Sequence, residues 1–285
     1  MTGEIISRMP VDEYRAIDAL NITRLKELRR SPMHYRYAQL YPKVTDPLIL
    51  GVAAHVAVLE PERFERQFAV WDRRTDAGAM APRRGQYWDE FQRQHGDKEC
   101  LTPDQAALAK AIATAVRGDE FAMRYLASGE PEVVMTWRTP QPGGRNCKGR
   151  VDWLAHVNGE PALIGLKTTR DCRPFVFGSQ AAKLDYALQW AWYFNGYCAI
   201  KHGERPRMVE IVVESAPPHA VVVYRIPDDI ILQGEDNYQA LLAQLEECEA
   251  TDRWPGPATC EQVLTLPSWY YPAVDDDISD MGLVV

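Results

Sequence analysis

The chain has 285 residues, of which 46% are hydrophobic and 25% are charged, as is usual for a soluble globular protein. This composition excludes disordered and fibrous chains. The formal net charge of −8 argues against a nucleic-acid partner, because proteins bind polyanions largely through Lys and Arg. However, residues 226–285 hold thirteen acids and one base, a net charge of −12, which leaves residues 1–225 at +4. The net charge therefore does not exclude DNA binding by the first 225 residues.

The cysteines and the N-terminus bear on location. The six cysteines form no C-x-x-C pair, and the first 20 residues contain no apolar segment typical of a signal peptide. No uncharged apolar run approaches the roughly 20 residues that a membrane-spanning helix needs. We expect free thiols, a cytoplasmic protein and no membrane partner.

Residues 1–127 have the pattern of helices. Asn21 is a suitable N-cap for an amphipathic helix, and an Ala-rich helix is predicted from residue 103 to about residue 126. Residues 47–59 are apolar almost all round, which predicts a buried helix with one polar interruption, His55.

The pattern changes to strands and helices after residue 127. Predicted strands cover 132–138, 148–156, 162–168, 208–215 and 220–226, and predicted helices cover 174–183, 186–201 and 228–250. The first three strands are separated by turn residues and should be antiparallel. We predict one α/β domain over residues 1–270, with a mainly helical part (1–127), a sheet core of about five strands with flanking helices (128–250) and an acidic tail (271–285).

Two short segments carry the most informative chemistry. Asp152 ends the sequence GRVD and Lys167 stands in the sequence GLKT, one predicted hairpin later, and neither residue type is usual inside a strand. A carboxylate can bind a hard divalent cation, while a nearby lysine can orient the attacking water and offset the charge on a phosphate. The alternative is a cross-strand ion pair with a purely structural role.

Two further features suggest a site. Gln189 and Tyr193 are four residues apart on one predicted helix, so both can hydrogen-bond from the same face. His55 is either a core histidine with satisfied hydrogen bonds or a metal ligand.

Taken in chain order, these segments resemble the PD-(D/E)XK nuclease superfamily and, within it, the RecE-like phage and prophage exonucleases of the exodeoxyribonuclease VIII type. The segments that carry the resemblance are ITRLKELRRSPMHYRY, GVAAHVAVLEPERF, CKGRVDWL, LKTTRD, QWAWYFNGY and LPSWYYP. The resemblance implies a restriction-endonuclease-like α/β fold, in which helices flank a central mixed sheet and the N-terminal region is helical.

The resemblance also implies a site for Mg²⁺ or Mn²⁺. Its ligands would be His55, Asp152 and the main-chain carbonyl of Leu166. In such nucleases the motif lysine assists the water, a Gln–Tyr pair holds the substrate phosphate, and an acid on the preceding strand supports the site. These catalytic roles would fall on Lys167, Gln189, Tyr193 and Glu132.

Gly165 departs from the family pattern, which places an acid two residues before the lysine. Glycine offers no side-chain oxygen, and losing an anionic ligand weakens metal binding. The chain could be an introduced inactive variant or a natural silent homologue, and we favour these two explanations. The third is that another acid, such as Glu132, Glu160 or Asp171, supplies the oxygen.

The implied activity is that of a metal-dependent 5′→3′ exonuclease on double-stranded DNA ends, which serves phage-type homologous recombination. Relatives imply a homotrimer or homotetramer and a single-strand annealing recombinase as a partner. The alternative is a catalytically silent nuclease-fold protein that binds DNA ends or acts as a scaffold. The acidic tail is either a solvated surface, or a segment that repels DNA or docks on a basic partner. The residues that we expect to contact DNA are Arg24, Arg29, Arg30, Lys148, Arg150, Thr168 and Arg170.

Overall fold

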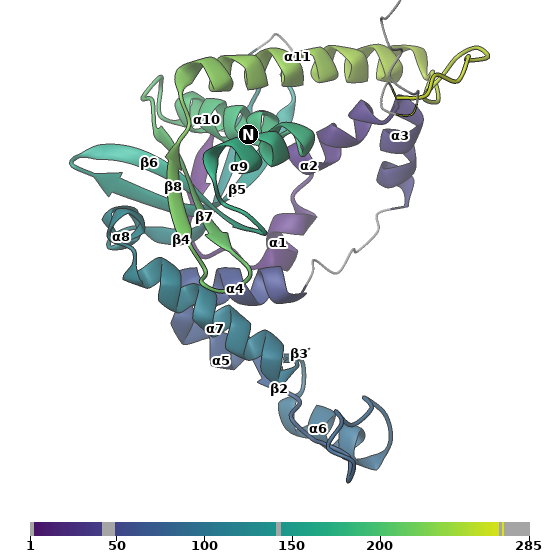
Figure 1. Ribbon diagram of the computed structural model, residues 1–285. Helices are drawn as coiled ribbons and strands as arrows, with labels where there is room; N and C mark the ends of the chain where they lie inside the picture. The colour runs from purple at the N-terminus through teal and green to yellow at the C-terminus, as the bar shows by residue number, and fades with distance from the viewer. Residues whose placement is uncertain (1–2, 42–48, 141–143, 268–269, 271–285) are drawn as a thin grey trace, which may run out of the picture.

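The computed structural model describes residues 3–41, 49–140, 144–267 and 270 (Figure 1). The predicted acidic tail, residues 271–285, lies outside these residues.

A six-stranded mixed sheet forms the centre of the fold (Figure 1). All neighbouring strands are antiparallel except β6 and β7, which are parallel. A parallel pair needs a crossover connection, and the helices α9 (Pro174–Lys183) and α10 (Tyr186–Ile200) provide it. In spatial order the strands are β1 (Glu4–Ile6), β4 (Glu130–Arg138), β5 (Asn146–Val157), β6 (Glu160–Thr169), β7 (Arg207–Glu214) and β8 (Val221–Arg225).

Helices cover both faces of this sheet. The long helix α11 (Asp228–Thr251) packs with α10 over one face, and α4 (Ile49–Leu59) packs with α7 (Pro103–Gly118) over the other (Figure 1). Leu163 of β6 belongs to the buried cluster on the α10 side, and the next residue, Ile164, belongs to the cluster on the α4 side. The strand is therefore buried on both faces.

The N-terminal region is helical, as predicted. Asn21 caps α2 because its side chain accepts a hydrogen bond from the main-chain N of Arg24, and Ser31 caps α3 by accepting from that of His34. A separate strand pair leads away from the sheet to α6 (Figure 1). The remaining elements are α1 (Val11–Ala16), α2 (Ile22–Leu25), the 3-10 turn η1 (Lys26–Arg29), α3 (Pro32–Leu40), α5 (Pro61–Gln67), β2 (Phe68–Val70), α6 (Gln86–His95), β3 (Glu99–Leu101) and α8 (Glu120–Leu126).

The expected α/β architecture is confirmed, with two differences in detail. The sheet has a sixth strand, β1, which pairs with the edge of β4. The predicted Ala-rich helix is two helices, because Asp119 ends α7 and its side chain caps α8 by accepting a hydrogen bond from the main-chain N of Ala122. None of the helices in the described ranges has the length and apolar composition required to cross a bilayer.

Candidate active site

Three predicted site residues meet where β4, β5 and α4 come together. The register of the β4–β5 ladder places Glu132 opposite Asp152. His55 approaches from α4, with its Nδ1 4.0 Å from Oδ2 of Asp152. One potential ligand atom from each residue lies within 4.8 Å of the other two, and all three residues line a pocket of about 370 Å³. One imidazole nitrogen and two carboxylates suit a divalent cation.

The main chain of Leu166 joins this group. Its N–H donates a hydrogen bond to Oδ2 of Asp152 at 2.8 Å. Burial lowers the pKa of His55, against the raising effects of the Asp152 carboxylate and a hydrogen bond to the Leu166 main chain. The imidazole is therefore neutral at pH 7 and has a lone pair to offer a metal. The structure thus brings His55, Asp152 and the main chain of Leu166 together, and the His55, Glu132 and Asp152 side chains suit a divalent cation.

Glu132 is held in an unusual environment. Its φ of +54° is uncommon for a residue other than glycine, and such strain often occurs at functional sites. Burial raises the pKa of the Glu132 carboxyl to about 7, although the Arg150 guanidinium opposes this shift. Arg150 Nε lies 2.5 Å from Oε2 of Glu132. The predicted DNA contact Arg150 is therefore already committed to an acid of the site.

Lys167 forms its ion pair with Glu210 of β7. Its Nζ lies 3.2 Å from Oε1 of Glu210, so the structural interpretation, a pair with Asp152, assigns the lysine to the wrong acid. Burial lowers the pKa of Lys167, but the carboxylates of Glu210 and Asp152 outweigh this effect and raise the pKa above its usual value. Lys167 is therefore protonated, and it can orient water or offset negative charge.

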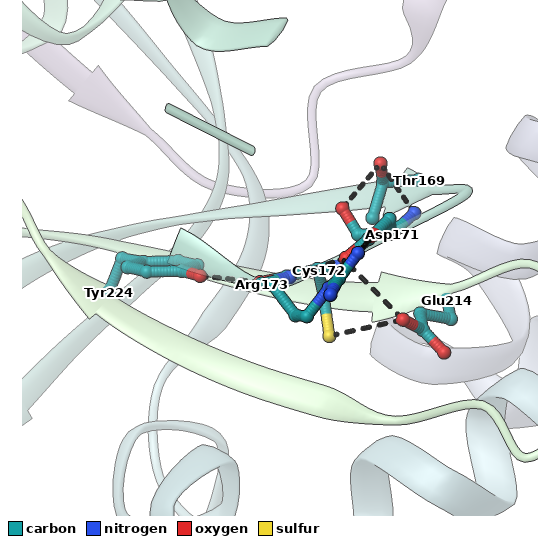
Figure 2. Close-up of polar contacts among 6 residues, drawn as sticks. All are labelled: Thr169, Asp171, Cys172, Arg173, Glu214 and Tyr224. Carbon is teal, nitrogen blue, oxygen red and sulfur yellow. Dashed lines mark hydrogen bonds and ion pairs between the residues drawn. The ribbon is translucent and has the colours of Figure 1, made fainter. Parts of the chain in front are cut away.

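Two of the proposed replacements for the missing acid lie elsewhere. Glu160 begins β6, about 16 Å along the strand from Gly165, and pairs with Arg207. Asp171 follows β6, and both of its carboxylate oxygens contact the guanidinium of Arg173 (Figure 2). Neither acid lies at Gly165.

Gln189 and Tyr193 form the expected pair on α10. Nε2 of Gln189 donates to the Tyr193 hydroxyl at 3.2 Å, and both side chains line a small cavity together with Asp152 and Lys167. A Cβ atom at Gly149 would lie only 2.8 Å from the Tyr193 ring. The glycine of GRVD therefore lets the ring pack against β5.

The structure does not support the predicted DNA contact of Lys148. The residue is only 4% exposed, and its ammonium donates to the main-chain carbonyls of Tyr14, Arg15 and Ile17. Because all three N–H donors are used, Lys148 ties the N-terminal segment to β5.

The other basic residues remain predicted DNA contacts. Arg29 is tied to Asp185 at the start of α10, with 2.9 Å between Nη2 and Oδ1. Arg24, Arg30 and Arg170 are exposed and Thr168 is half-buried.

Sequence reasoning missed two charged residues near the site. Lys26 and Lys167 both lie over the ring of Tyr186, with Nζ 5.8 Å and 5.5 Å from its centroid. Burial lowers the pKa of Lys26 to about 8, helped by Lys167 and opposed by Asp185. The second residue, Glu210, interrupts the apolar strand MVEIVV, and a single acid in such a run could have drawn attention to it.

Comparisons with known proteins identify the family of the chain. The family model described as a PDDEXK-like domain of unknown function (DUF3799) matches residues 21–266, which include every residue of the candidate site. A solved structure of a candidate exonuclease from Eubacterium rectale is similar, with a TM-score of 0.58 and 14% identity over 91% of this chain and 96% of that chain. The solved structure of SSO0001 covers 81% of each chain at 13% identity, with a TM-score of 0.38.

No curated protein matches the sequence. At 14% identity the Eubacterium rectale structure shows the fold alone, while the family match covers most of the chain. The chain belongs to the PDDEXK-like DUF3799 family, within the PD-(D/E)XK nuclease superfamily.

Proposed function

We propose that this protein is a metal-dependent nuclease that degrades double-stranded DNA from its ends in the 5′→3′ direction. The observation that carries the proposal is the group formed by His55, Glu132 and Asp152, beside the protonated Lys167. Metal-ligating side chains next to a lysine suit the hydrolysis of a phosphodiester.

Each side chain has a defined task in this proposal. A divalent cation, when bound, would supply the Lewis acidity that activates water and stabilises the phosphate in its transition state. His55 and Asp152 would hold the cation, while Lys167 orients the attacking water and offsets the developing charge. Gln189 and Tyr193 would position the phosphate for in-line attack.

The charge distribution supports a DNA substrate. Residues 1–225 carry a net charge of +4, although the whole chain carries −8. Lys26 lies beside Lys167, and both could neutralise phosphates near the scissile bond. We further propose that the 3′ single-stranded tails serve recombination with an annealing protein, and that the nuclease acts as a ring-like homo-oligomer.

The test is cleavage of a linear duplex with 5′-phosphates in Mg²⁺ or Mn²⁺, with each strand labelled separately at its 5′ or 3′ end. We expect loss of the 5′ label first, no cleavage of closed circular duplex, and a rate about 1,000-fold lower in Asp152→Asn. Asp171→Asn is the matched control and should retain activity, since Asp171 pairs with Arg173 outside the site.

Three results would contradict this proposal in different ways. Initial loss of the 3′ label would reverse the polarity, and cleavage of closed circles would exclude a strict exonuclease. A folded chain that binds duplex ends but cleaves with neither metal would support the silent end-binding alternative.

A further inference from the structure

We propose that Glu210 supplies the motif carboxylate that Gly165 lacks, as a further ligand for the cation from the neighbouring strand. The inference rests on the proposed function, since it assigns the same metal site one more residue. It replaces the explanation that the chain has lost its motif acid.

The strand register places Glu210 beside Gly165 in the sheet. Gly165 of β6 pairs directly with Glu210 of β7. The β5–β6 ladder ends at Trp153 and Ile164, one residue short of Asp152 and Gly165, and both of these residues line the same small cavity. Glycine therefore lies between two acids, one on each neighbouring strand. The motif acid is displaced by one strand, a distance of about 4.8 Å.

The Glu210 side chain reaches back across that distance. A Cβ atom built on Gly165 would lie 2.3 Å from Oε1 and 2.7 Å from Oε2 of Glu210. The carboxylate therefore occupies the space that a side chain at position 165 would take. A side chain at position 165 would therefore displace the Glu210 carboxylate from the place that it holds here.

The surroundings of Glu210 are those of a functional acid. The residue is 1% exposed, and burying a carboxylate is unfavourable unless it is paired. Trp190 Nε1 donates to its Oε2 at 2.5 Å. Oε1 forms the ion pair with Nζ of Lys167, at 3.2 Å. Oε1 is the Glu210 oxygen nearer to the Cβ position of Gly165, and we assign it to the cation.

A purely structural Glu210–Lys167 pair is the competing explanation. It does not account for Asp152, which lines the same small cavity as Glu210 and lies close enough to Lys167 to raise its pKa. Two carboxylates and one lysine around a glycine reproduce the composition of the PD-(D/E)XK motif in three dimensions.

Four versions of the full chain test the assignment: the unchanged chain, Glu210→Gln, Gly165→Asp and the exchange Gly165→Asp/Glu210→Ala. Glu214→Gln is the matched control, because Glu214 lies on the same strand but contacts Cys172 (Figure 2). The first readout is Mn²⁺ affinity by calorimetry without DNA. The second is the nuclease rate, and circular dichroism reports folding.

We expect Glu210→Gln to weaken Mn²⁺ binding at least about 10-fold, whereas Glu214→Gln leaves it unchanged. Gly165→Asp alone should fold poorly, since two carboxylates compete for one space. The exchange should fold and recover Mn²⁺ affinity to within about 5-fold of the unchanged chain, because the acid returns to the motif position.

Two results would overturn the assignment: equal Mn²⁺ affinity in Glu210→Gln and the unchanged chain, or a folded exchange variant that does not regain affinity. If Glu210→Gln does not fold, the Mn²⁺ affinity of the exchange variant Gly165→Asp/Glu210→Ala tests the assignment. Weaker Mn²⁺ binding in Glu210→Gln with no cleavage by any version would sustain this assignment and contradict the proposed nuclease. Cleavage by Glu210→Gln at the full rate, with unchanged Mn²⁺ affinity, would support the proposed nuclease and contradict the assignment of Glu210.

Discussion

The two sides of Asp152 differ in access and in charge. On the α4 side, His55 and Glu132 line an open pocket of about 370 Å³. On the α10 side, Lys167 and Glu210 pair around a cavity of about 10 Å³. The open side offers ligand atoms to an exchangeable cation, whereas packing fixes the charges of the buried side. Changes on the buried side should therefore affect stability as well as metal affinity and rate, whereas changes on the open side should mainly affect metal affinity.

Lys167→Met should have the largest effect. The substitution leaves the Glu210 carboxylate buried without the Lys167 ammonium that pairs with it. We expect this loss to lower the free energy of unfolding by about 3–5 kcal/mol in urea denaturation. The nuclease rate should fall at least about 100-fold, because a stabilising charge is lost.

The double variant Lys167→Met/Glu210→Leu is its control. Replacing a buried ion pair by apolar residues is often neutral, so stability should largely return while activity does not. If Lys167→Met alone were as stable as the unchanged chain, the buried side would not differ from the open side in its effect on stability.

Glu132→Gln tests the open side. We expect Mn²⁺ affinity to fall about 10-fold in calorimetry. The free energy of unfolding should change by less than about 1 kcal/mol, because burial already disfavours the charged carboxylate. Glu160→Gln, at the far end of β6, should change neither quantity. Unaltered Mn²⁺ binding in Glu132→Gln would exclude Glu132 from the metal group.

Gly149→Ala tests the packing of Tyr193 against β5 on the buried side. Its added methyl meets the Tyr193 ring, which should lower the free energy of unfolding by about 1–3 kcal/mol in thermal melting. Gly178→Ala is the control, since nothing lies within 4 Å of its Cβ position in α9 and alanine favours a helix by about 0.5–1 kcal/mol. Equal shifts in the two variants would mean that Tyr193 is free to move.

The elements that depend on local pattern could be predicted from the sequence. Helix α9 spans the predicted residues 174–183 because proline starts it, and β5 and β6 differ from prediction by one or two residues at each end. Strand β1 could not be predicted in this way, because its three residues are held only by pairing with the edge of β4.

The site residues differ in the same way, since some are identified by local motifs and others depend on long-range contacts. Asp152 and His55 are identified by short motifs, and the structure places them together. The burial of Lys148 depends on carbonyls more than 130 residues earlier in the chain, which no local pattern reveals. Glu210 faces Gly165 only because a two-helix crossover sets the register of two parallel strands.

The pairing of Gly165 with Glu210 restricts the order in which this sequence can change. An acid introduced first at position 165 would collide with the existing carboxylate, whereas loss of Glu210 first would leave the motif without its acid. Chains that carry the acid on one strand or on the other are therefore separated by an unfavourable intermediate. A glycine two residues before the lysine, together with an acid at the register-matched position of the next parallel strand, would identify homologues that share this arrangement.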